Sequence, residues 1–398
     1  MAKKGKKNNK GCGCFVAFVV MFFGLPTAFS GVVAAIDYFA EAEERAFKEQ
    51  WPAFFDPFDR AANHLDTGAY LDALSAAEQA LAAALATPEL HTDYLARAYA
   101  RKAEAHIGLW HYVDAEATLL QALAHADEAL QADLNRILAE VRGIITDNDT
   151  ERNEQHIYHA APGIGPARTL HGKVVIAYVF IDDGKHSTWS LKAEKTVLQH
   201  LELVKRWLQA QAQEYGTGGL TFTERIFHYD KDPWLRNALL SLHVEDAAFG
   251  YDLAGRVAAL QNAPSVNAFL YRLIREEAAD QAILLMHVNI AEKRSFAHVC
   301  WTACPEQAEY AFILKPARHH HWEATAYTQA HEALHLFGAD DLYNLKGGAQ
   351  YAPRDIMHNY ARYIEASVID SITAFGVGWL RRSPTPLPFP LQQADAAP

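Results

Sequence analysis

Basic residues are in the minority in this sequence. Its 398 residues include 36 Lys and Arg against 48 Asp and Glu, a formal net charge of −12 at pH 7. This acidic balance argues against a nucleic-acid-binding surface, which needs a basic patch to meet the phosphates. The sequence also has no glycine-rich phosphate loop and no dinucleotide fingerprint. We therefore expect no nucleic-acid partner.

Cysteine is also scarce, with four residues in the chain. Cys12 and Cys14 begin an apolar run, where we interpret them as small residues at a membrane boundary and not as lipidation sites. Cys300 and Cys304 form C-x-x-x-C without a second such pair, so no zinc site built on cysteine is expected. A short disulfide between them and two free thiols both remain open, and the choice depends on whether this part of the chain is exported.

The amino terminus has the pattern of a membrane anchor. Residues 1–10 form a lysine-rich head, and the uncharged run 11–36 that follows is long enough to cross about 30 Å of bilayer hydrocarbon. Lysines before the run and acidic residues after it predict a single-pass membrane protein with a cytoplasmic head and an extracytoplasmic remainder. The alternative is a cleaved signal peptide, because Ala28–Ser30 and Val33–Ala35 are both small-residue sites, and it would give a secreted or periplasmic protein.

Residues 41–145 predict an all-α domain, since Ala, Leu, Glu and Gln recur there at helical spacing with few Gly or Pro. The region contains an internal repeat, because Gly68–Ala73 aligns with Trp110–Ala115 at an offset of about 42 residues. This pattern is similar to tetratricopeptide repeats, which commonly bind a protein partner, although a brace for the rest of the chain is equally open. Two flanking helices are expected to cap the repeats, at Ala40–Phe55 and Ala126–Ile145.

The remaining chain divides into a linker, a mixed domain and a tail. Residues 146–170 predict a linker and residues 383–398, with five prolines, a disordered tail. Residues 171–382 alternate strand and helix patterns, which predicts an α+β fold. The expected strands are Lys173–Ile181, Leu220–Tyr229, Ile283–Ile290, Phe296–Trp301 and Tyr310–Leu314. The expected helices are Ser190–Tyr215, Val266–Ala279, Trp322–Phe337 and Ser367–Trp379.

The most informative stretch begins at His331. It reads H-E-x-x-H, a spacing that places two histidines one turn apart on the same face of a helix. His331 and His335 can therefore reach a single zinc ion, while Glu332 lies beside the first ligand without binding the metal. Zinc with three protein ligands and one open position lowers the pKa of a bound water to about 7. The pattern predicts metal-assisted hydrolysis with Glu332 as general base.

The third ligand is expected beyond the end of this helix. Gly338 is predicted to end the helix, and Asp341 follows with a carboxylate oxygen that zinc accepts. The stretch then reads H-E-x-x-H-x-x-G-x-x-D. It resembles the motif of the metzincin metallopeptidases, whose usual third ligand is histidine, and the aspartate variant resembles their snapalysin-like branch. Farther along, Arg354–Tyr360 resembles the methionine-bearing turn beneath the zinc in that clan.

The resemblance implies a catalytic domain at 171–382, with a twisted mixed sheet and an active-site helix, and a zinc endopeptidase acting on peptide or protein substrates. One Zn²⁺ would be held by His331, His335 and Asp341. In such enzymes the substrate lies extended along an antiparallel edge strand, which the strand order places at Phe296–Trp301.

The resemblance also suggests a phenol that stabilises the oxyanion, and Tyr360 and Tyr363 are the candidates. In several metzincins that tyrosine stands two residues after the methionine, where this chain has Asn359. The role of Tyr360 is therefore an expectation and not a motif match.

Two other functions are compatible with the sequence. A gluzincin-like peptidase would take its third ligand from a downstream carboxylate such as Asp355 or Glu365, which the methionine turn disfavours. A repeat-based scaffold with an inactive peptidase domain would have no need of Glu332. His358 is interpreted as a substrate contact or a turn residue. The other histidines weighed as ligands are interpreted as surface or core residues: His64, His91, His106, His111, His125 and His319–His321.

Overall fold

The computed structural model describes residues 48, 50–87, 90, 92–150, 157–160, 165–230, 232–240, 247–290, 295–299, 308–314, 324–358 and 363–393. The predicted cytoplasmic head and the predicted membrane span at 11–36 lie outside these residues, as do Cys300, Cys304 and Tyr360. Among the helices of these ranges, none combines the length and the apolar character needed to cross a bilayer.

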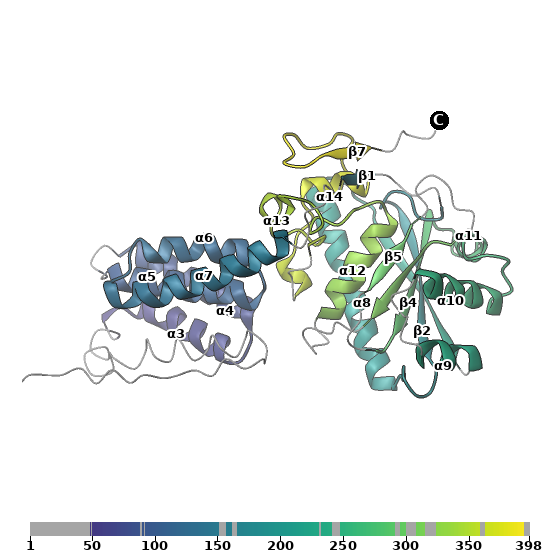
Figure 1. Ribbon diagram of the computed structural model, residues 1–398, viewed down its shortest axis with the longest axis horizontal. Helices are drawn as coiled ribbons and strands as arrows, with labels where there is room; N and C mark the ends of the chain where they lie inside the picture. Colours follow the sequence, from purple (N-terminus) through teal and green to yellow (C-terminus); the bar gives the residue numbers. More distant parts are fainter. Residues whose placement is uncertain are drawn as a thin grey trace, which may run out of the picture.

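The chain forms a helical part and a part built on a sheet, which lie at opposite ends of the molecule in Figure 1. Successive helices of the helical part pack against one another, and the small buried residues Ala73, Ala105 and Ala115 allow close approach. Its helices are α3 (Pro52–Asp66), α4 (Tyr70–Leu85), α5 (Thr92–Gly108), α6 (Tyr112–Leu123) and α7 (Glu128–Thr150). The aligned tyrosines of the repeat begin α4 and α6, so the internal repeat corresponds to two helical hairpins, α3–α4 and α5–α6.

The second part contains a five-stranded sheet in the order β3-β2-β4-β6-β5. Strands β3, β2, β4 and β6 run parallel, and β5 runs antiparallel to β6 at one edge. The strands are β2 (Lys173–Asp182), β3 (Thr221–Asp230), β4 (Gln281–Val288), β5 (Phe296–His298) and β6 (Tyr310–Leu314). The predicted antiparallel edge strand is thus confirmed for Phe296–His298, and the mixture of helices with a mixed sheet confirms the α+β expectation at that level.

Both faces of the sheet are covered by helices. Alternate residues of β2 enter two different cores, because successive side chains of a strand point to opposite faces. Val174, Ile176, Tyr178 and Phe180 pack toward α8 (Leu191–Glu214) and α12 (Ala324–Leu336). Val175, Ala177, Val179 and Ile181 pack toward α9 (Pro233–Leu240), α10 (Ala247–Leu260) and α11 (Val266–Glu276). Each large apolar side chain buried in this way contributes about 1.5–3 kcal/mol, which explains the uninterrupted apolar pattern of β2.

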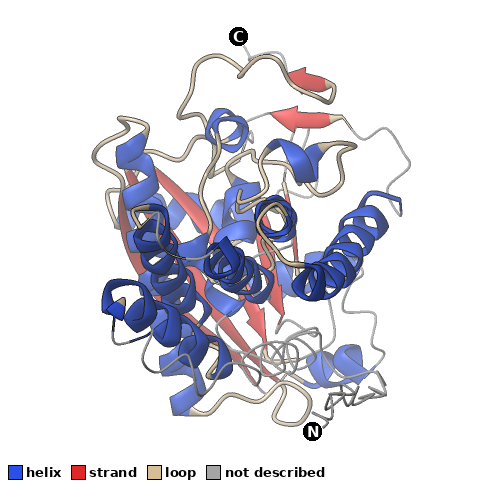
Figure 2. Cartoon of the chain, turned by 90° about the vertical axis from the view of Figure 1, so that its left-hand side faces the viewer, coloured by secondary structure: helices blue, strands red, loops and turns tan. Residues whose placement is uncertain are grey.

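Two boundary predictions were wrong. The predicted linker contains a strand, β1 (Tyr158–Ala160), and the predicted disordered tail contains another, β7 (Leu391–Gln393). The two strands pair in parallel. Residues 157–160 and 165–170 are therefore not a plain linker, and residues 383–393 are not a disordered tail. Figure 2 shows this two-stranded ribbon apart from the main sheet, close to the carboxyl terminus. Phe389 lies 6.1 Å from Tyr158 between ring centroids, and both rings are buried. The proline-rich composition of this segment did not indicate that Phe389 would pack against Tyr158.

The helices also differ from expectation, and the short helix α13 (Gly348–Tyr351) is one that was not predicted. The sequence did not predict α9 or α10. The expected helix at Ser367–Trp379 is reduced to α14 (Ser371–Gly376), because the backbone N–H of Ile356 donates to the carbonyl of Val368 at 2.9 Å and holds that segment extended. The short 3₁₀ helix η1 (Ile364–Ala366) precedes it.

The two parts of the chain are in direct contact. Tyr363, from the sheet part, packs with Leu65 and Tyr70 of the helical part. Its hydroxyl donates a hydrogen bond to the Gly68 carbonyl at 3.4 Å. The repeats therefore rest against the segment that follows the methionine turn.

Candidate metal centre

Helix α12 carries His331, Glu332 and His335. It ends in a left-handed turn at Gly338, where φ is 100° and where a side chain would be strained. The N–H of Ala339 donates to the Leu334 carbonyl at 3.2 Å, a bond typical of a helix end that folds the chain back. The predicted helix end at Gly338 is confirmed, and the turn returns Asp341 toward the histidines.

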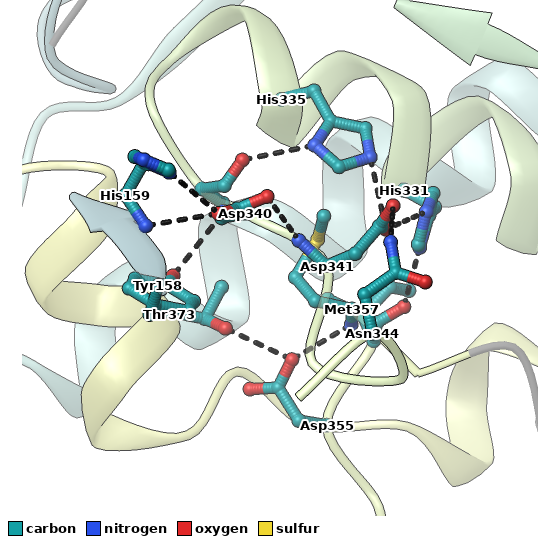
Figure 3. Close-up of polar contacts among 12 residues, drawn as sticks. Tyr158, His159, His331, His335, Asp340, Asp341, Asn344, Asp355, Met357 and Thr373 are labelled. Carbon is teal, nitrogen blue, oxygen red and sulfur yellow. Dashed lines mark hydrogen bonds and ion pairs between the residues drawn. The ribbon is translucent and has the colours of Figure 1, made fainter. Parts of the chain in front are cut away.

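Three ligand atoms converge at this turn (Figure 3). The Nε2 atoms of His331 and His335 lie 3.1 and 3.2 Å from Oδ1 of Asp341. Tetrahedral zinc with bonds of about 2.0–2.1 Å separates its ligand atoms by about 3.3 Å. Both imidazole–carboxylate distances therefore already match the spacing of a zinc ligand set, and the three ligand atoms all lie within 4.8 Å of one another.

The other nitrogen of each imidazole is fixed by a backbone carbonyl. Nδ1 of His331 lies 2.8 Å from the Ile356 carbonyl, and Nδ1 of His335 lies 2.9 Å from the Ala339 carbonyl. A carbonyl only accepts hydrogen bonds, so each Nδ1 carries the proton and donates it. Both Nε2 atoms are then left to bind a cation or a second proton, which is how ligating histidines are oriented in metal sites.

The electrostatics of the site favour positive charge between these atoms. Burial by itself would lower the pKa of His335, but the Asp341 carboxylate reverses the direction and raises it to about 10. Burial would raise the pKa of Asp341, and the two imidazoles instead hold it well below its usual range. A divalent metal ion would supply this positive charge and would compete with protons for the same atoms.

Glu332 is 5 % exposed and lies next to His331 on α12. Among the described residues, its Oε2 has no hydrogen-bond partner. Burial raises the pKa of Glu332, and the neighbouring histidines oppose this. A buried carboxyl group with a raised pKa is suited to accepting a proton and returning it.

The two adjacent aspartates have different surroundings. Asp340 accepts hydrogen bonds from the backbone N–H groups of His159 and Asp341, at 2.9 and 2.8 Å. Asp341 instead presents Oδ1 to the two imidazoles, while Asn344 donates to its Oδ2 at 3.2 Å. Asp340 therefore fixes the turn and strand β1, and no described contact joins it to a ligating histidine.

The methionine turn supports the first histidine through its backbone. Asp355 accepts a hydrogen bond from the N–H of Met357 at 2.7 Å and another from Thr373 at 2.9 Å. This fixes the Ile356 carbonyl, which accepts from His331. Met357 is fully buried and belongs to the core beneath α12. Asp355 is thus engaged by the turn and is not positioned as a third ligand.

Replacing Asp355 by asparagine should destabilise the fold by about 1–3 kcal/mol, because an NH₂ group would face the N–H and O–H donors that the carboxylate accepts. Zinc affinity should fall about 10–100-fold through the misplaced Ile356 carbonyl. Urea unfolding of the metal-free chain and a zinc competition titration measure the two effects. Glu365→Gln is the matched control, because Glu365 is exposed on η1. Equal stability of the two variants would contradict the role given to Asp355.

Three further residues around the site were not found from the sequence. Tyr327 donates to the Ile356 carbonyl at 2.7 Å, Tyr343 stacks on His331 with ring centroids 6.2 Å apart, and Asn344 orients Asp341. Tyr327 precedes His331 by one helical turn, so its place on the same face could have been read from the spacing. The other two depend on the turn after Gly338, which the sequence does not specify.

The remaining candidates are placed as follows. Glu365 is exposed and is not among the converging ligands. His358 is buried, and it does not belong to the group of potential metal ligands formed by His331, His335 and Asp341. Tyr363 donates a hydrogen bond to the Gly68 carbonyl of the helical part. Tyr360 and His319–His321 lie outside the described residues. Comparisons with protein families, with curated proteins and with solved structures found no match for this chain.

Proposed function

We propose that this chain is a zinc-dependent endopeptidase. The observation that supports this most strongly is the convergence of His331, His335 and Asp341 at the spacing of zinc ligands, with Glu332 beside them. The H-E-x-x-H-x-x-G-x-x-D pattern and the methionine turn resemble the metzincin motif, and the parallel sheet with one antiparallel edge strand is compatible with a metzincin-like catalytic domain.

Each residue of the site has a separate proposed role in hydrolysis. A zinc ion held by the two imidazoles and the carboxylate would polarise the scissile carbonyl and acidify a water molecule. Glu332 takes a proton from the attacking water and transfers it to the leaving amine. The carbonyls of Ile356 and Ala339 hold the imidazoles in the orientation that exposes Nε2. Tyr360 remains the candidate for oxyanion stabilisation.

Strand β5 is the proposed recognition element for an extended substrate. It forms one edge of the sheet, pairs on one side with β6, and packs beside α12, which carries the histidines. Within the described ranges, no strand pairs with its outer side. A peptide added to this edge would be held by main-chain hydrogen bonds close to the zinc ligands.

Peptide binding along β5 predicts an alternating dependence on substrate amides. N-methylation of an amide that pairs with β5 should lower kcat/KM about 2- to 10-fold, because one hydrogen bond contributes about 0.5–1.5 kcal/mol. N-methylation of the next amide, which points away, should have little effect. Kinetics on a methyl-scanned series of one cleaved peptide measures this. Uniform loss at every position, or none, would contradict pairing with β5.

Two other functions have weaker support. A gluzincin-like ligand set is disfavoured because Asp355 accepts hydrogen bonds from the turn and Glu365 is exposed. An inactive scaffold would not need a buried carboxyl group at Glu332 beside the ligands. We also propose that the enzyme is exported and membrane-anchored through residues 11–36, and that the repeats offer a surface for a protein partner.

Cleavage profiling tests the proposed function. The zinc-loaded full chain is incubated with a peptide library, and the products are identified by mass spectrometry. Cleavage at internal peptide bonds that stops with a chelator and returns with Zn²⁺ is the expected result. Absence of cleavage by a chain with one zinc bound at His331, His335 and Asp341 would reject the peptidase and favour the scaffold.

A further inference from the structure

A second group of ligand-type side chains lies in the helical part. His106 lies in the last turn of α5, His111 is the N-cap residue of α6, and Asp114 lies in the first turn of α6. His106 and His111 are 6 % and 2 % exposed. Within the described part of the chain, Nδ1 of His106, both ring nitrogens of His111 and Oδ2 of Asp114 lack a hydrogen-bond partner. Each unsatisfied buried polar atom costs about 1–3 kcal/mol, so this cluster calls for an explanation.

The turn between the two helices brings these side chains together. Trp110 has a positive φ of 64°, and the N–H of His111 donates to the His106 carbonyl at 2.9 Å. The two imidazole rings lie 5.8 Å apart between centroids, and Nδ1 of His111 lies 4.0 Å from Oδ2 of Asp114. One ligand atom from each of the three residues lies within 4.8 Å of the others.

We propose that His106, His111 and Asp114 bind a divalent transition-metal ion of the zinc class, separately from the candidate catalytic site. Two imidazoles and one carboxylate form a donor set that Zn²⁺ and Co²⁺ accept. The ligand atoms lie within 4.8 Å of one another and need to approach by up to about 1.5 Å to reach tetrahedral spacing, which side-chain rotations supply. A bound ion would satisfy the buried atoms that have no hydrogen-bond partner among the described residues.

The protonation state of the histidines suits this role. Burial lowers the pKa of His106 to about 3 and that of His111 to about 4. Both imidazoles are therefore neutral at pH 7, with a lone pair available for a metal. Nearby positive groups, Arg354 among them, contribute to the same direction.

The first repeat shows that the backbone does not require these histidines. Its turn has the same form, since the N–H of Ala69 donates to the His64 carbonyl at 2.8 Å. Ala69 has φ −83° and ψ 65°, and His111 at the corresponding position has φ −80° and ψ 65°. The first repeat therefore makes this turn with alanine and lacks the second imidazole. The fold therefore does not require a buried histidine at position 111.

The proposed site lies where the two parts of the chain meet. Nε of Arg354, from the segment leading into the methionine turn, lies 3.8 Å from Oδ2 of Asp114. The Arg354 side chain is 55 % exposed, so it can turn into solvent when a cation takes its place. A metal ion here would compete with Arg354 for Asp114 and would change the contact between the repeats and the catalytic domain.

Metal stoichiometry tests the proposal. The full chain, purified in mild detergent and equilibrated with Zn²⁺ or Co²⁺, is expected to bind two ions, and His111→Ala one. His111→Ala should fold, because Ala69 occupies the same turn in the first repeat. His64→Ala is the matched control and should keep two ions. Equal metal content in His111→Ala and the unmodified chain would overturn the proposal.

A third variant separates this proposal from the proposed function. His335→Ala should retain one ion if the repeat site exists, and His335→Ala combined with His111→Ala should retain none. If the unmodified chain binds a single ion that His111→Ala removes and His335→Ala does not, the repeat site stands and the catalytic site fails. If the unmodified chain binds a single ion that His335→Ala removes and His111→Ala does not, the repeat site alone is overturned.

Substitution of Arg354 tests whether this residue competes with the metal ion for Asp114. In His335→Ala, the further change Arg354→Gln should tighten Co²⁺ binding about 3- to 10-fold, because it removes a positive charge close to a ligand. A purely structural Arg354–Asp114 ion pair would give no such gain. Unchanged or weaker Co²⁺ binding would overturn the competition between Arg354 and the metal.

Discussion

Glu332→Gln is expected to lower peptide-hydrolysis turnover by at least about a hundredfold while the zinc remains bound, which is the usual size of general-base catalysis. Glutamine preserves the shape of the side chain but cannot accept the proton from the attacking water. Because Glu332 is buried and is not among the three converging ligand residues, its replacement should leave the metal affinity nearly unchanged. Single-turnover cleavage and zinc content are measured on the same preparation.

Glu365→Gln is the control for this variant, since it removes an acidic group of the same kind from an exposed position on η1. It should retain both turnover and zinc. Unchanged turnover in a zinc-replete Glu332→Gln chain would refute the mechanism. Loss of zinc from that variant would instead give Glu332 a structural role.

Asp341→Ala should reduce zinc affinity by at least about a hundredfold, because it removes one of three ligands and leaves two imidazoles without their charged partner. Asp340→Ala should retain most of the zinc affinity and lose stability, since Asp340 bonds the backbone N–H groups of His159 and Asp341. Asp341→His should partly preserve binding, because imidazole is also a good zinc ligand. Competition with a chromogenic zinc chelator gives the three affinities.

The comparison of the two neighbouring aspartates makes this test selective. Both substitutions remove one carboxylate from the same turn, so a general effect of charge would act on them alike. Asp341→Ala with full zinc affinity, together with loss of zinc in His358→Ala or Glu365→Ala, would refute the Asp-type ligand set.

The sequence predicted those features that follow from local spacing. Strands β2, β4 and β6 appear as apolar runs because they are buried on both faces. Helix α12 presents His331 and His335 together because they lie four residues apart. Gly338 was expected to end the helix, and its positive φ places it in the left-handed conformation that ends α12. The internal repeat was visible because residues at the start of α4 recur at the start of α6, with Tyr70 and Ala73 matched by Tyr112 and Ala115.

The sequence could not predict contacts between distant segments. The pairing of β1 with β7 joins residues near 158 to residues near 391, and the prolines around Phe389 favoured a disordered tail. Asp355 was weighed as a ligand because its chemistry permits that role, and only the fold shows that it holds the N–H of Met357. His106 and His111 were interpreted as surface or core histidines, since their approach depends on the turn at Trp110.

The central claim is that a zinc ion at His331, His335 and Asp341 hydrolyses peptide bonds, and zinc reconstitution of the metal-free full chain tests it most directly. The cleavage rate of one profiled peptide is followed as Zn²⁺ is added to the unmodified chain and to His335→Ala. We predict no cleavage without metal, a rise with added zinc in the unmodified chain, and no rise in His335→Ala. Cleavage by the chelated chain, or equal cleavage by zinc-loaded His335→Ala, would contradict the claim.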